Sequence, residues 1–67
     1  MTRYRITVRG RLSARLTSAF DPMTPEPGPG HTDLIGDLTD QAQLYGVLDQ
    51  LRNLGLELVS VRPEVAP

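Results

Sequence analysis

The sequence predicts one small α+β domain spanning residues 1–67, and three observations carry this prediction. Residues 4–12 alternate apolar and polar side chains, which is typical of a half-buried strand. Residues 40–55 combine an N-cap, an apolar stripe at helical spacing and a terminating glycine, and so indicate one complete amphipathic helix. Residues 56–62 are rich in leucine and β-branched residues, which predicts a closing strand.

The first strand separates apolar from basic side chains. Its predicted buried side consists of Tyr4, Ile6 and Val8, and its predicted exposed side of Arg3, Arg5, Thr7, Arg9 and Arg11. A short helix is predicted next, because Ser13 can cap a first turn and apolar residues then recur at helical spacing. These are Leu12, Leu16, Ala19 and Phe20. The pair Asp21-Pro22 predicts where this helix ends.

The middle of the chain carries four prolines and two glycines within residues 22–30. Because proline has no N–H group to donate, a central strand cannot run through this segment. We expect a Pro/Gly-rich loop around residues 22–31, with residues 23–26 as a ragged edge strand and 27–30 as a turn. Residues 31–38 then return to an extended alternation that sets Leu34, Gly36 and Leu38 against Asp33, Ile35 and Asp37.

The second helix has both of its end signals. Asp40 is the expected N-cap, with Gln43 placed to complete a capping box. Gly55 supplies the left-handed residue that ends the helix. The apolar stripe between them consists of Leu44, Val47, Leu48, Leu51 and Leu54. After the closing strand, residues 63–67 are expected to form a frayed tail.

The predicted order is strand, helix, strand, strand, helix, strand, which is the ferredoxin-like βαββαβ arrangement. We therefore expect a four-stranded antiparallel sheet with two helices on one face. The first and third strands should be central neighbours, and we expect them to run parallel. The alternative is a three-stranded sheet in which residues 22–30 are only loop.

Size and composition limit the possible functions. A chain of 67 residues buries only a thin core, and with no cysteine and one histidine it has neither disulfides nor an evident metal site. We therefore expect self-association, as a homodimer. A net charge of -1 disfavours a general nucleic-acid or anionic-membrane binder. The chain starts without a secretion signal and has no membrane-spanning run, so a cytoplasmic location is expected.

A longer motif resembles a known group. Residues 40–61 read DQAQLYGVLDQLRNLGLELVSV, and residues 4–12 read YRITVRGRL. The first segment resembles a group of small uncharacterised actinobacterial proteins that share the pattern DQA-x-L-x-G-x-L-x-x-(L/I)-R-x-L-G-L-x-L-x-S-V, and the second resembles them more weakly. The resemblance covers most of the chain outside the proline-rich middle, where those proteins have a plainer hairpin. It implies a single domain and no particular activity.

The basic side of the first strand is the main candidate interaction surface, formed by Arg3, Arg5, Arg9 and Arg11. Alternate strand residues lie about 6.6 to 7 Å apart, close to the spacing of phosphates along a nucleic-acid strand. However, the stacking aromatics of RNA-binding sheets are missing. Asp33 and Asp37 should share this side, so cross-strand ion pairs are the simpler interpretation. A protein contact and a nucleic-acid contact are the alternatives.

Tyr45 and Gly46 are candidates for a second contact. Glycine inside a helix costs about 1 kcal/mol relative to alanine, which predicts close approach of another backbone, either within the chain or from a second subunit. Tyr45 is the kind of amphipathic side chain that interfaces favour. His31 follows the Pro/Gly segment without an evident catalytic partner and is interpreted as solvated.

No catalytic, metal-binding or cofactor-binding set is predicted, so no cofactor is expected. The leading hypothesis is a non-enzymatic, self-associating protein-interaction module, acting as an accessory subunit or regulator. The first alternative is a binder of small anions, or an enzyme, of the dimeric α+β barrel type, in which two sheets enclose a pocket. The second alternative is nucleic-acid binding through the arginines. The sequence identifies no partner other than a second copy.

Overall fold

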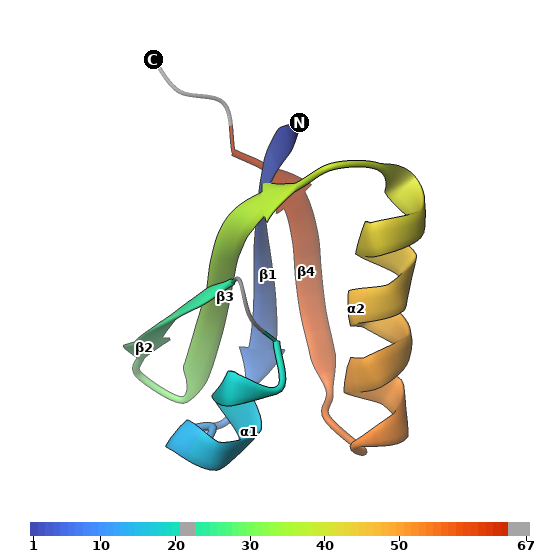
Figure 1. The fold of residues 1–67 in the computed structure, drawn as a ribbon. Coiled ribbons are helices and arrows are strands. Elements are labelled where there is room, and N and C mark those ends of the chain that lie inside the picture. Colours follow the sequence, from blue (N-terminus) through green and yellow to red (C-terminus); the bar gives the residue numbers. More distant parts are fainter. Residues whose placement is uncertain (21–22, 65–67) are drawn as a thin grey trace.

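The computed structural model describes residues 1–20 and 23–64, which form a four-stranded antiparallel sheet and two helices (Figure 1). The elements in chain order are β1 (Thr2–Arg9), α1 (Ala14–Ser18), β2 (Thr24–Gly28), β3 (His31–Leu38), α2 (Gln41–Asn53) and β4 (Leu58–Pro63). The predicted α+β class is confirmed. The three-stranded alternative is wrong, because β2 pairs with β3 along its whole length.

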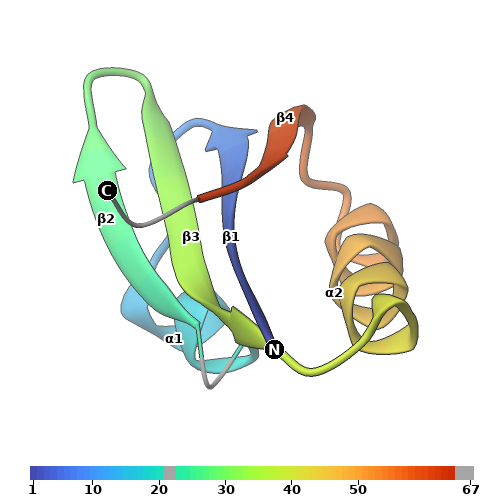
Figure 2. The ribbon, with the colours of Figure 1, turned by 90° about the horizontal axis from the view of Figure 1, so that it is seen from above.

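The strand order in the sheet is β2-β3-β1-β4. The first and third strands are central neighbours, as predicted, but they run antiparallel and not parallel. The reason is topological: α1 returns the chain so that β2 runs in the direction of β1, and the tight β2–β3 turn then reverses it. β4 pairs antiparallel with the other side of β1. β2 and β4 are therefore the two edges of the sheet (Figures 1 and 2).

The proline-rich segment is more regular than its sequence predicts. β2 covers Thr24–Gly28, two residues beyond the predicted strand, and the predicted turn shrinks to Pro29 and Gly30. Gly30 has a φ of 71°, which glycine adopts without strain. Proline at the first turn position and left-handed glycine at the second are the preferences of a type II turn. Met23 precedes the strand and is buried.

The first helix has only five residues. Its predicted cap is confirmed, because the Ser13 hydroxyl accepts a hydrogen bond from the N–H of Leu16 at 3.2 Å. Phe20 is buried just after the helix, whereas Ala19 is exposed. Thr17 is buried, and its hydroxyl donates to the Ala14 carbonyl. The predicted stop at Asp21-Pro22 lies outside the described residues.

The second helix begins and ends as predicted. The Asp40 carboxylate accepts a hydrogen bond from the N–H of Gln43 at 2.9 Å. The Gln43 side chain reaches one residue further back than a standard capping box and accepts from the N–H of Thr39 at 2.7 Å. At the other end, Gly55 has a φ of 73° and donates to the Arg52 carbonyl. Together with the bond from the Leu56 N–H to the Leu51 carbonyl, this is a Schellman motif.

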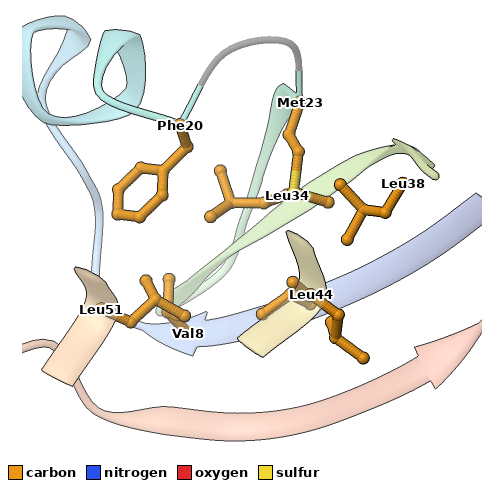
Figure 3. Close-up of a cluster of buried hydrophobic side chains, with 8 residues drawn as sticks. Val8, Phe20, Met23, Leu34, Leu38, Leu44 and Leu51 are labelled. Carbon is orange, nitrogen blue, oxygen red and sulfur yellow. The ribbon is translucent and has the colours of Figure 1, made fainter. Parts of the chain in front are cut away.

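The core lies on the side of the sheet that carries Ile6 and Val8, and both helical segments contribute to it. Its buried residues are Ile6, Val8, Phe20, Met23, Leu34, Leu38, Leu44 and Leu51. Seven of them are labelled in Figure 3, where Leu34 lies between Phe20 and Leu38. Of the predicted α2 stripe, Leu44 and Leu51 are buried and Val47 and Leu48 are half-buried. Leu54 is 43% exposed because it is the C-cap residue, where the helix ends.

The end of β4 differs from the predicted tail. Pro63 belongs to the strand, and Glu64 donates its backbone N–H to the Arg3 carbonyl at 2.7 Å. The frayed tail was therefore placed two residues too early, since pairing with β1 orders Pro63 and Glu64. The remainder of that predicted tail, residues 65–67, lies outside the described residues.

Candidate functional site

The candidate site is the open face, defined here as the side of the sheet that bears Arg3, Arg5, Thr7 and Arg9, opposite Ile6 and Val8. Arg11 does not belong to this face, because β1 ends at Arg9 and Gly10 turns the chain with a φ of 87°. The strict alternation predicted as far as residue 12 thus stops earlier. The Leu12 N–H instead donates to the Thr32 hydroxyl, which itself donates to the Gly10 carbonyl.

Arg5 lies at the centre of the open face and is held by acidic side chains from three different parts of the chain. Its Nη1 lies 2.5 Å from Oδ2 of Asp33 on β3. Its Nε lies 2.5 Å from Oε2 of Glu64, which follows β4. A third carboxylate, Glu26 on β2, lies 3.9 Å away. These carboxylates neutralise the charge of Arg5 within the sheet. Only 19% of the Arg5 side chain is exposed.

The hydrogen bonds of this cluster hold it in its charged form. The bonds to Glu64 and then Asp33 raise the pKa of Arg5. The bond from Arg5 lowers the pKa of Glu64. Partial burial acts to raise the pKa of Asp33, but hydrogen bonds from Thr7 and Arg5 outweigh it, so the pKa is lowered. The Thr7 hydroxyl donates to Asp33 Oδ1 at 2.7 Å. A carboxylate that already accepts from two donors and has a lowered pKa is a poor general base.

The other arginines of the predicted surface are also paired where they lie on β1. Arg9 Nε is 3.1 Å from Oε2 of Glu57, and Arg3 Nε is 3.8 Å from Oε1 of Glu64. The expected cross-strand ion pair with Asp33 is confirmed. Asp37 makes none within residues 1–20 and 23–64, although it lies opposite Arg3 in the strand register.

Several members of the open face were missed by sequence reasoning, among them Glu26 on β2 and Arg62, which the register sets opposite Arg5. Glu64 was assigned to the tail, and its role depends on the pairing of β4 with β1. Ile35 is only 6% exposed although it lies on this face, where the register sets it between Arg5 and Thr24. The signal for Ile35 in the sequence was an apolar residue on the same side of the strand as Asp33 and Asp37. The burial of Ile35 shows that the open face contains a small apolar centre beside the ion pairs of Arg5.

His31 is the first residue of β3 and not part of a solvated loop. Its ring lies against Gly28, where an added Cβ would come within 2.6 Å of Nε2. Nδ1 lies 3.0 Å from the Pro29 carbonyl oxygen, and Nε2 lies 4.0 Å from Oδ1 of Asp33. A carboxylate is therefore nearby, contrary to the sequence interpretation. That carboxylate is already bound by Arg5 and Thr7, so the group does not form a nucleophile and base pair.

Tyr45 and Gly46 lie apart from the open face, on the exposed side of α2. Tyr45 is 61% exposed. A Cβ added at Gly46 would meet nothing within 4 Å, so the expected close approach of another backbone within the chain is wrong. The glycine with a close backbone neighbour is Gly36 in β3, whose added Cβ would lie 3.0 Å from the Cα of Met23. Contact of Tyr45 and Gly46 with a second subunit stays a prediction.

Residues 1–20 and 23–64 lack the features of three common kinds of site or segment. This part of the chain contains no pocket and no group of three or more His, Cys, Asp or Glu side chains that could hold a metal ion. Within the same residues, no helix has the length and apolar character needed to cross a membrane.

The fold and the open face together define a small α+β protein whose sheet carries an internally neutralised ion-pair cluster. The chain belongs to the family described as domain of unknown function (DUF8691), whose model matches residues 3–62. No curated protein and no solved structure matches the chain.

Proposed function

We propose that this protein is a non-enzymatic, self-associating interaction module that serves as an accessory or regulatory subunit. The observation that carries the proposal is a run of exposed apolar side chains where α2 leads into β4. Leu54, Leu58 and Val59 are 43%, 45% and 54% exposed. Single exposed apolar residues are normal on a protein surface, but three within six positions of the chain favour a contact surface.

The ion pairs of the open face support this proposal over the two alternatives. A binder of nucleic acid or of small anions needs basic groups that a phosphate or carboxylate can reach. Arg5, the central arginine, is already neutralised by Asp33 and Glu64. A guest anion would have to displace these carboxylates, at a cost comparable to what it gains. The open face therefore favours a structural role for the arginine row.

We also propose a fold type, a group of source organisms and a cellular compartment for this protein. The strand order β2-β3-β1-β4, with crossovers through α1 and α2, supports assigning the fold to the ferredoxin-like type. The motif of residues 40–61 supports an actinobacterial origin. A cytoplasmic location, expected from the sequence, is part of the same proposal.

Sedimentation equilibrium across a range of protein concentrations tests the proposal. We expect twice the monomer mass at high concentration and reversible dissociation on dilution. A thermal-shift screen with small organic anions is the matched measurement for the pocket alternative. A species that stays monomeric at all concentrations would contradict self-association, and stabilisation by one class of anion would favour the ligand-binding alternative.

A further inference from the structure

β4 is an edge strand that contributes little to the core. It lies at one end of the strand order and pairs with β1, with a register shift that leaves Val59 as an extra residue. Val61 is half-buried and the other residues of β4 are exposed, whereas β1 and β3 both have buried side chains. Apolar burial therefore holds β4 less firmly than the central strands, and its attachment depends mainly on its pairing with β1.

Both ends of β4 are attached to β1 by a backbone hydrogen bond and an ion pair. Before the strand, the Glu57 carbonyl accepts from the Arg9 N–H at 2.9 Å, and the Glu57 carboxylate lies 3.1 Å from Arg9 Nε. After the strand, the Glu64 N–H donates to the Arg3 carbonyl at 2.7 Å, and Glu64 Oε2 lies 2.5 Å from Arg5 Nε. A β4 from a second copy carries the same two carboxylates at the same spacing. It therefore fits β1 in the same register and with the same charge complementarity.

Residues 54–56, the hinge segment, join the end of α2 to Glu57 and the start of β4 (Figure 1). Gly55 has a φ of 73°. Because glycine adopts positive and negative φ about equally well, a change at this one residue redirects the chain after it. Exposed apolar side chains lie on both sides of Gly55, since Leu54, Leu58 and Val59 are 43%, 45% and 54% exposed.

We propose that the dimer forms by exchange of β4, so that residues 57–64 of each copy pair with β1 of the other copy. This inference rests on the proposed self-association and specifies how the two chains join. The exchanged dimer keeps every contact between β4 and β1, and only the hinge segment changes its conformation.

The exposed apolar side chains fit this arrangement. In a two-fold dimer the two hinge segments cross near the axis, because each passes from its own sheet to the sheet of the other copy. Leu54, Leu58 and Val59 of the two copies then lie close together. The exchange thus buries apolar side chains that the single chain exposes to water.

A pair of cysteines across β1 and β4 tests the exchange directly, since the chain has no cysteine of its own. Thr7 and Ser60 are partners in the register. Antiparallel partners have Cα atoms about 4.5 to 5.5 Å apart, within the range of a disulfide. The double variant Thr7→Cys and Ser60→Cys is separated into monomer and dimer fractions, oxidised and then denatured. We expect the dimer fraction to stay covalently linked and the monomer fraction to contain the bond within one chain.

The two single variants are the controls for this experiment. Thr7→Cys alone and Ser60→Cys alone should give little linked dimer, because each position faces the other one and not its own copy. A mixture of the two single variants, unfolded and refolded together at high concentration, should give a linked dimer that contains one chain of each.

The hinge segment provides the second test. Gly55→Ala strains the positive φ of the monomer, and this strain is relieved when the hinge segment opens, so the association constant should rise about tenfold or more. Gly30→Ala is the matched control. Gly30 has a φ of 71°, and an added Cβ meets nothing within 4 Å at either glycine. Its strain is the same in monomer and dimer, so sedimentation equilibrium should show an unchanged association constant.

The results separate the inference from the proposed function. A wild-type chain that is monomeric at every concentration overturns both. A dimer fraction that denatures to internally bonded single chains, or a Gly55→Ala variant that associates no more strongly than Gly30→Ala, overturns the exchange and leaves self-association in place through another surface. If the double variant forms no disulfide in either fraction, the two alanine variants decide the question. A linked dimer fraction, together with stronger association of Gly55→Ala, supports the exchange.

Discussion

Arg5 and Asp33 form an ion pair across β1 and β3, with Nη1 of the guanidinium 2.5 Å from Oδ2 of the carboxylate. The two residues are 28 positions apart in the chain, and their side chains are 19% and 13% exposed. The pair thus joins the two central strands from the side opposite the core. It also fixes the charge state of the open face, because Glu64 completes the cluster.

This cluster predicts a loss of stability in acid. Asp33 and Glu64 both have a pKa below the usual value in the folded chain. Such carboxylates stabilise the fold above their unfolded pKa of about 4, and this contribution is lost as the pH falls through the lower, folded pKa. We expect the free energy of unfolding to decline below about pH 4. Urea titrations at a series of pH values measure it.

The variant Asp33→Asn tests the same cluster at one position. It should lower the free energy of unfolding at neutral pH, because Arg5 loses a charged partner, and its difference from wild type should shrink toward acid pH. Asp37→Asn is the control, since Asp37 is exposed, and it should change little. Equal effects of the two variants would show that the Arg5 pair contributes no more than a solvated surface charge.

The two glycines of β3 and α2 should respond oppositely to alanine. Gly46→Ala should raise the stability of the monomer by about 1 kcal/mol, because alanine is the better helix former and the added Cβ meets nothing within 4 Å. Gly36→Ala should lower stability, because its Cβ would lie 3.0 Å from the Cα of Met23 and the backbone must shift. Thermal unfolding at low protein concentration measures both.

The larger variant Gly46→Leu addresses the second subunit. Space around Gly46 in the single chain is open, so the fold should tolerate leucine. A loss of dimer mass in sedimentation, with an unchanged monomer spectrum, would place Gly46 and Tyr45 at the subunit contact. Unchanged mass and melting temperature would count against a contact there.

The cap of α2 predicts a measurable local contribution. Asp40→Ala removes the acceptor for the Gln43 N–H and should cost about 1 kcal/mol. Asp49→Ala is a suitable control, because Asp49 is an exposed residue of α2 that pairs with the exposed Arg52 three positions on, and such pairs contribute about 0.2 to 0.5 kcal/mol. Chemical denaturation of the two variants should rank Asp40 well above Asp49.

The open face should not bind nucleic acid. Fluorescence anisotropy with single-stranded RNA and duplex DNA at low salt is expected to show no binding, since Arg5 and Arg9 are both paired with carboxylates. Binding that weakens with salt and disappears in the double variant Arg5→Glu and Arg9→Glu would contradict this expectation.

Local signals were enough to predict most elements of the fold. Ser13, Asp40 and Gly55 act at helix ends through hydrogen bonds to residues a few positions away, so their roles can be read from short segments. The alternation in β1 likewise predicted its buried side. Arg11 was assigned wrongly because a period of two in the sequence does not show where pairing stops, and the left-handed turn at Gly10 ends the strand.

The sequence by itself determined the α+β class, the order of elements and the chemical character of each face, because helical and strand periodicity depend on neighbouring residues. Only the tertiary structure decided that Glu64 and Asp33 neutralise Arg5, that Ile35 is buried on the open face, and that Gly36 rather than Gly46 lies against another backbone. These features depend on which strands become neighbours and in which direction they run. That information lies in contacts between residues far apart in the chain.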